Sequence, residues 1–287
     1  MVNLTRRAVL GVTVGTLAAS VARRATAQGS DDPFPLLPAA YGADSQRDFL
    51  PRPTLGNVPP PQIDRDVARR LMERAPFDCA PVDVALYFRD VGQGKMPDLG
   101  SDALQRRAGP HFVRGWPRYY NPVVVGFFQA TTLDPTRYDG DGTHWCAAFV
   151  NWCIARGRST SAAVPPQAPA RAFGTRSASS GSFRCWPSAG GSTRTPQRGD
   201  VVVWAKEGTV SGCSLGTGHV AFFLGNEPDG RILVVGGNQR DPETVVGATQ
   251  SAVCRKAMPR SFNVARAGQP AVRKTLHSYR TAGFLRA

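Results

Sequence analysis

The sequence predicts an α+β fold in which helices come first and an antiparallel β-sheet follows. Residues 64–74 and 82–91 carry apolar side chains at helical spacing. The turn signal Asn226-Glu-Pro-Asp-Gly230 separates two apolar runs and is typical of a hairpin. These two runs and an earlier one are short and rich in β-branched and aromatic residues, at 200–204, 219–224 and 231–235. Helices followed by hairpin-connected strands are the order of an α+β protein.

A third helix is predicted after Asn121. Asn is a favoured N-cap residue, and Pro122 stands where proline is favoured at a helix start. Residues 123–128 then supply an apolar face. Their β-branched side chains leave a strand possible, but the cap favours the helix.

A fourth helix is predicted to begin at Cys146, because Phe149, Val150 and Cys153 follow it at three, four and seven residues. A thiol at a helix N-terminus lies next to unpaired backbone N–H groups and the positive end of the helix dipole, which both stabilise the thiolate. The alternative is that Cys146 is a small buried apolar residue. Three residues of the capping type precede it, Asp139, Asp141 and Thr143.

Residues 1–27 have the features of a secretory signal peptide. Arg6 and Arg7 precede an apolar run, and Ala25-Thr-Ala27 has the small-x-small form of a cleavage site. The paired arginines resemble the twin-arginine export signal of bacteria. The apolar run is about fifteen residues long, shorter than the roughly twenty that a spanning helix needs, so cleavage is favoured over a membrane anchor. We expect a periplasmic or secreted mature protein with no transmembrane segment.

The net charge of +14 suggests a polyanionic partner. About +10 remains once the four arginines of the predicted signal are removed. The sequence has no basic motif with interleaved aromatic residues, the pattern that would indicate a nucleic-acid partner. Anionic polymers of the cell envelope, peptidoglycan among them, are therefore the expected partner.

The six cysteines show no CxxC or Cys/His spacing of the zinc-binding kind, so neither a metal nor a cofactor is expected. Export permits disulfides. Residues 159–195 are rich in Ser, Ala, Pro and Gly and are expected to form a long irregular loop. Cys185 and Cys213 bracket the same irregular region and are the first candidate pair.

A cysteine enzyme needs a base beside the thiol and a polar group that orients the base. His219 follows small residues at the mouth of an apolar strand, where a substrate has room. Gly236-Gly-Asn-Gln239 ends the next predicted strand, and its glycines allow a close backbone approach. Asn238 or Gln239 could accept the ring N–H of His219 and fix its tautomer.

Four segments together resemble the CHAP and NlpC/P60 superfamily of papain-like cysteine amidases and peptidases, which mostly cut bacterial peptidoglycan. They are Trp145-Cys-Ala-Ala-Phe-Val-Asn-Trp152, Arg198-Gly-Asp-Val-Val-Val-Trp204, Gly218-His-Val-Ala-Phe-Phe and Gly236-Gly-Asn-Gln239. Residues 177–185 are also similar to a stretch in one exported branch of these proteins. The resemblance covers about residues 119–258. It implies a papain-like fold, with the catalytic cysteine at the N-terminus of a helix that packs on an antiparallel sheet.

By this resemblance Cys146 is the nucleophile, His219 the base and Asn238 the orienting residue of a thioester mechanism. The implied reaction is cleavage of an amide bond in peptidoglycan, as a muramoyl-alanine amidase or a stem-peptide endopeptidase. The alternatives are a catalytically weak or inactive envelope-binding module, and a cysteine transpeptidase or peptidase that acts on proteins. Candidate substrate-binding residues are Trp145, Trp204 and Gln239.

Four segments organise the chain in this interpretation. The signal peptide occupies residues 1–27, and residues 28–62 form an extended linker in which prolines are frequent. Residues 63–118 form a helical N-terminal extension, and residues 119–287 form the catalytic domain.

Overall fold

The computed structural model describes eight stretches of the chain, residues 59–116, 119–135, 140–159, 175–186, 195–206, 218–240, 251–266 and 269–279. The predicted signal peptide, nearly all of the proline-rich segment and much of the predicted loop at 159–195 lie outside these residues. Within the described stretches, no helix combines the length and the apolar character that a membrane crossing requires.

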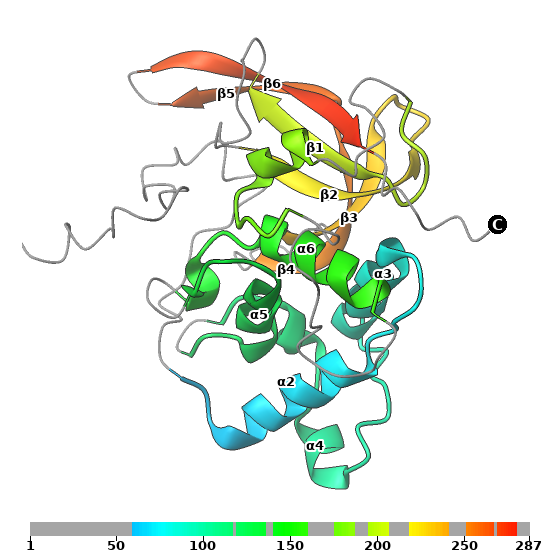
Figure 1. Ribbon diagram of the computed structural model, residues 1–287, viewed down its shortest axis with the longest axis vertical. Helices are drawn as coiled ribbons and strands as arrows, with labels where there is room; N and C mark the ends of the chain where they lie inside the picture. Colours follow the sequence, from blue (N-terminus) through cyan, green and yellow to red (C-terminus); the bar gives the residue numbers. More distant parts are fainter. Residues whose placement is uncertain are drawn as a thin grey trace, which may run out of the picture.

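The helices form a layer below the sheet in the view of Figure 1, with α6 next to the sheet and α2 and α4 far from it. Helix α6 contacts strands β2 and β3 on one side and α3 and α5 on another. The helices are α2 (Gln62–Arg74), α3 (Pro81–Gly92), α4 (Asp102–Arg107), α5 (Pro122–Phe127) and α6 (Cys146–Gly157).

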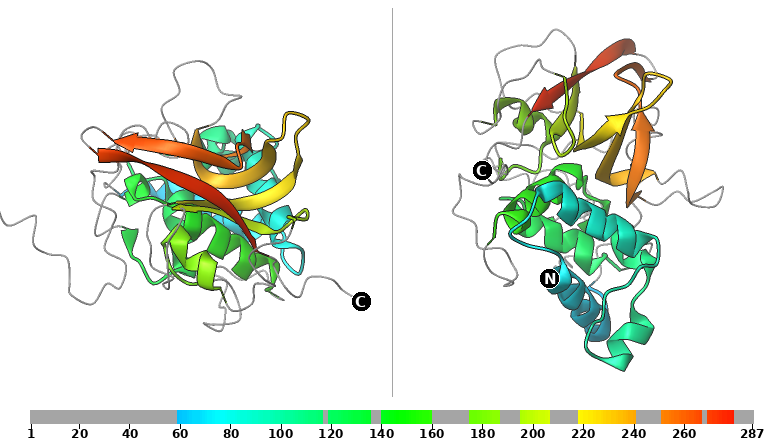
Figure 2. Two further views of the ribbon diagram at one scale, coloured as in Figure 1. Left: turned by 90° about the horizontal axis from the view of Figure 1, so that it is seen from above. Right: turned by 90° about the vertical axis from the view of Figure 1, so that its right-hand side faces the viewer.

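Six antiparallel strands form one sheet in the order β4-β3-β2-β1-β6-β5, and Figure 2 shows that this sheet is strongly twisted and curled. Because β1 lies between β2 and β6, a strand late in the chain completes the middle of the sheet. The strands are β1 (Val201–Lys206), β2 (His219–Asn226), β3 (Ile232–Arg240), β4 (Ser251–Met258), β5 (Ser261–Arg266) and β6 (Gln269–Tyr279).

Alternation along the strands gives the sheet two apolar faces. Val201, Val203 and Phe222 belong to the large core that the sheet shares with the helices. Trp204 and Phe223 point to the opposite face, where a second cluster receives side chains from β5 and β6. Helices on both sides of residue 118 contribute to the large core, and the predicted division of the chain at that residue stays a prediction.

The predicted α+β class is confirmed, and so is a helix that begins at Cys146 and packs on an antiparallel sheet. The cap at Asn121 is also confirmed, because its side chain accepts hydrogen bonds from the N–H groups of Val123 and Val124. The hairpin turn joins β2 to β3 as predicted. The Gly-Gly-Asn-Gln segment lies at the end of β3, which continues through it to Arg240.

Candidate functional site

Cys146 is the first residue of α6, and its side chain is buried. The predicted side-chain cap is absent, because Trp145 occupies the N-cap position and makes no capping hydrogen bond. Asp141 instead accepts hydrogen bonds from the backbone N–H groups of Trp116 and Asn121, at 2.7 and 2.9 Å. The carboxylate therefore joins the loop before α6 to the loop before α5. Asp139 lies outside the described residues.

The start of β2 touches the thiol. The backbone N–H groups of Val220 and Ala147 are donors to the sulfur of Cys146 and lower the pKa of its thiol. Burial is the larger influence and raises the pKa of the Cys146 thiol to about 11, while these donors and the charge of Lys274 oppose it. The thiol is therefore protonated at neutral pH, although the helix N-terminus alone favours a thiolate.

His219 is the residue immediately before this hydrogen-bond donor. It is the first residue of β2 and is paired with Trp204 of β1, and the two ring centroids are 6.0 Å apart. Burial, and to a smaller extent the charges of Lys256 and Lys274, lower the pKa of the imidazole to about 3. The imidazole is therefore neutral at neutral pH, the form that can accept a proton.

Asn238 lies on the neighbouring strand. On the two paired strands, Asn238 lies three residues after Val235 and His219 lies three residues before its partner Phe222. The register between β3 and β4 shifts between Gly236 and Gln239, and Asn238 has a φ of 58° within this bulge. Bulges of this kind redirect side chains next to active sites. The buried Nδ2 of Asn238 has no hydrogen-bond partner among the residues that the structure describes.

Two glycines allow these elements to come together. A Cβ at Gly237 would overlap the ring of Trp145 and lie 2.8 Å from the Cβ of Phe149. The first turn of α6 therefore packs directly on the backbone of β3 beside Asn238. A Cβ at Gly218 would overlap the carbonyl oxygen of Trp204, so glycine is required where the chain enters β2.

Comparison with known families agrees with this arrangement. Residues 138–238 match the family model of the CHAP domain. The chain contains a CHAP domain. CHAP domains are typically amidases or peptidases that act on peptidoglycan. No curated protein and no solved structure matches the chain.

The CHAP match contains all three predicted catalytic residues, Cys146, His219 and Asn238. The strands of the sheet continue beyond it, because β4, β5 and β6 follow residue 238. The catalytic roles of the three residues stay a prediction.

The three predicted substrate-binding residues are fully buried in this structure, so their contact with substrate stays a prediction. They are Trp145, Trp204 and Gln239. The indole of Trp145 donates a hydrogen bond to Ser251 at 3.2 Å, and that of Trp204 donates to the carbonyl of Pro259 at 2.9 Å.

Sequence reasoning missed one charged residue near the CHAP site. Lys274 lies on β6, is only 6 % exposed, and influences the pKa values of both Cys146 and His219. It is brought there by the pairing of β6 with β1, in which Leu276 opposes Trp204. No local motif could have signalled this, because the pairing joins segments far apart in the sequence.

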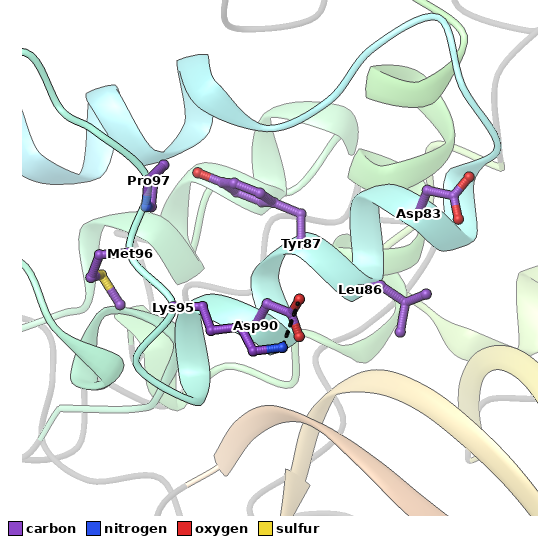
Figure 3. Close-up of a pocket in the computed structure, with 7 residues that line it drawn as sticks. All are labelled: Asp83, Leu86, Tyr87, Asp90, Lys95, Met96 and Pro97. Carbon is purple, nitrogen blue, oxygen red and sulfur yellow. Dashed lines mark ion pairs between the residues drawn. The ribbon is translucent and has the colours of Figure 1, made fainter.

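A separate cavity of about 440 Å³ lies beside α3 (Figure 3). It contains an ion pair between Asp90 and Lys95, whose charged atoms are 3.5 Å apart. None of the candidate catalytic residues lines it. Among the described residues, no cluster of His, Cys, Asp and Glu side chains could hold a metal ion. The lining residues are Asp83, Leu86, Tyr87, Asp90, Lys95, Met96 and Pro97.

Proposed function

We propose that this chain is an exported cysteine hydrolase that cleaves amide bonds in bacterial peptidoglycan. The observation that carries the proposal is the contact between the sulfur of Cys146 and the N–H of Val220, the residue after His219. This contact brings the first turn of α6 to the start of β2. The CHAP match over the same residues supports a substrate in the cell wall.

The proposed mechanism begins from a neutral pair rather than from a preformed thiolate–imidazolium pair. The raised pKa of Cys146 and the lowered pKa of His219 both favour the neutral forms. His219 takes the thiol proton as the sulfur attacks the amide carbonyl, which gives a tetrahedral oxyanion. Backbone N–H groups in the first turn of α6 are suitable donors to this oxyanion.

Collapse of the tetrahedral species breaks the C–N bond and leaves a thioester on Cys146. The imidazolium of His219 gives its proton to the departing amine. His219 then accepts a proton from water as the hydroxide attacks the thioester. Breakage of the C–S bond releases the carboxylic acid, and the imidazolium of His219 returns its proton to the sulfur of Cys146. Asn238 holds the imidazole in position during both steps.

The proposal includes export. Arg6, Arg7 and the apolar run that follows support a twin-arginine signal, and delivery to the periplasm or beyond brings the enzyme to its polymer. The positive net charge favours association with anionic envelope polymers.

The test is digestion of purified peptidoglycan by the mature protein, with mass spectrometry of the released fragments. Cys146→Ser is the test variant, and Cys254→Ser is the matched control because Cys254 is also a buried cysteine. We expect fragments from the wild type and from the control, and none from Cys146→Ser. The new ends identify the bond. An amidase frees the muramoyl carboxyl group and the amine of the first alanine, whereas an endopeptidase frees a carboxyl group and an amine within the peptides and leaves the muramoyl amide intact.

Equal fragments from wild type and Cys146→Ser would contradict the mechanism. The burial of Cys146 and His219 favours one alternative, a catalytically weak module that binds the envelope. Peptidoglycan sedimentation would then retain the protein while no fragment appears.

A further inference from the structure

The segment that leads into α3 lies directly on the last turn of α6. The backbone N–H of Cys79 donates to the carbonyl of Gly157 at 2.8 Å, and the N–H of Asp78 donates to the carbonyl of Ser159 at 2.9 Å. A Cβ at Gly157 would lie 2.8 Å from the carbonyl oxygen of Cys79. The two backbones are therefore in contact at this point.

A second cysteine lies one helical turn away. Cys153 precedes Gly157 by four residues on α6, and residues at this spacing lie on the same face of a helix. Burial raises the pKa of Cys153 well above its usual range, and the charge of Cys79 adds to this effect. The two thiols are thus close enough to influence each other. They are not bonded to each other in the structure.

The two thiols differ in their access to solvent. Cys153 is fully buried, whereas Cys79 is only partly buried. Burial raises the pKa of Cys79 to about 11, and the guanidinium of Arg156 opposes this rise. Of these two thiols, only that of Cys79 can therefore meet an external oxidant while the protein is folded.

We propose that Cys79 and Cys153 form a disulfide once the protein has been exported. The inference rests on the proposed export and not on the proposed catalysis. The oxidant is an exported protein of the disulfide-exchange class, because disulfides form in such compartments.

The exchange takes two steps. The thiolate of Cys79 attacks one sulfur of the oxidant's disulfide, which forms a mixed disulfide and releases one oxidant thiol. Cys153 then loses its proton and its sulfur attacks that of Cys79, which releases the second oxidant thiol. Two protein thiols are oxidised, one external disulfide is reduced, and the two protons end on the released thiols.

The bond would tie α6 to the N-terminal end of α3. Because Cys146 and Cys153 are seven residues apart on the same helix, the bond also fixes the helix that carries the proposed nucleophile. It would consume the thiol of Cys79, the partly exposed cysteine, and leave Cys146 reduced.

The test uses the purified full chain, first reduced and then incubated with oxidised glutathione in mildly alkaline buffer. After blocking of free thiols in denaturant, non-reducing peptide mapping by mass spectrometry should find a peptide that links Cys79 to Cys153. The same link should appear in Cys146→Ser and Cys254→Ser. It should be absent from Cys79→Ser and Cys153→Ser.

A thermal melt gives a second readout. A disulfide that closes a loop of this length should raise the melting temperature by about 10 °C over the reduced protein. Cys79→Ser should show no such difference between oxidising and reducing conditions. The inference would be overturned if both Cys79 and Cys153 carried the blocking reagent after oxidation, because both thiols would then have stayed free. A disulfide from either residue to another cysteine would overturn it too. The disulfide is also expected in Cys146→Ser, a variant without the proposed nucleophile. A missing disulfide therefore tests this inference separately from the proposed catalysis.

Discussion

The sulfur of Cys146 accepts a hydrogen bond from the backbone N–H of Val220. This one contact joins the first residue of α6 to the second residue of β2, and so joins the helical layer to the sheet at the point where His219 stands.

Removal of either member of the Cys146–His219 pair should abolish most of the activity. We expect Cys146→Ala and His219→Gln each to lower kcat by about 10³-fold or more, with the double variant no worse than the worse single variant. Residues that act as one unit show such non-additivity. Fragment release from peptidoglycan at saturating substrate measures it, and losses that simply multiply would show that the residues act separately.

Lys274 should tune the thiol through its charge. Replacing it by Met removes a cation that lowers the pKa values of both Cys146 and His219, so both should rise. The pH profile of Cys146 alkylation, followed by peptide mass spectrometry, should shift to higher pH. Lys256→Met is the matched control, because Lys256 acts on the pKa of His219 and is not among the influences on Cys146. Equal shifts in both variants would refute a specific role for Lys274.

Asp141 should make stability depend on pH. Burial raises its pKa from 3.8 to about 7, although backbone N–H groups of Trp116 and Asn121 oppose the rise. The folded state therefore binds a proton more tightly than the unfolded state. The stabilisation from Asp141 is complete below about pH 4 and is lost as the pH rises through about 7.

We accordingly expect Asp141→Asn to reduce the change in the free energy of unfolding between pH 4 and pH 7 by about a few kcal/mol at most. The fold should be kept, because the amide oxygen can still accept hydrogen bonds from both N–H groups. Urea unfolding across this pH range measures the effect. Asp229→Asn, at an exposed hairpin turn, should leave the profile unchanged. A wild type whose stability is constant between the two pH limits would show that the carboxylate is not destabilised.

Gly237→Ala should damage both stability and activity. The added methyl group would overlap Trp145, so the residue before Cys146 has to move. Overpacking of this kind costs about 1–3 kcal/mol. Gly225→Ala is the control, because a Cβ there meets nothing within 4 Å. Thermal melts and fragment release compare the two, and equal behaviour would mean that the α6–β3 contact is readily rearranged.

Local signals predicted the elements that carry the candidate site. The Asn121–Pro122 pair, the periodicity after Cys146 and the turn at 226–230 act over a few residues and identified α5, α6 and the β2–β3 hairpin. The last three strands were missed. Their sequences mix charged and apolar residues, as in Ser251–Met258, and partly buried strands near the edges of a sheet give weak alternation.

The position of Asp141 and the burial of Lys274 were also not predictable. Each depends on a partner far away in the chain: the loops before α5 for Asp141 and strand β1 for Lys274. An Asp before a helix predicts a cap, and the competing backbone N–H groups become visible only in three dimensions.

The order of the strands has a consequence for how the protein acquires its chemistry. His219 and Asn238 are synthesised before β6, yet β6 supplies the second neighbour of β1 and Lys274, a cation that lowers the pKa of the thiol. When the ribosome has just added Asn238, every residue of the proposed triad has been synthesised. None of β6, the strand that completes the middle of the sheet, has yet been made. The nascent chain is therefore expected to be catalytically silent, and competence arrives late in folding through a long-range pairing.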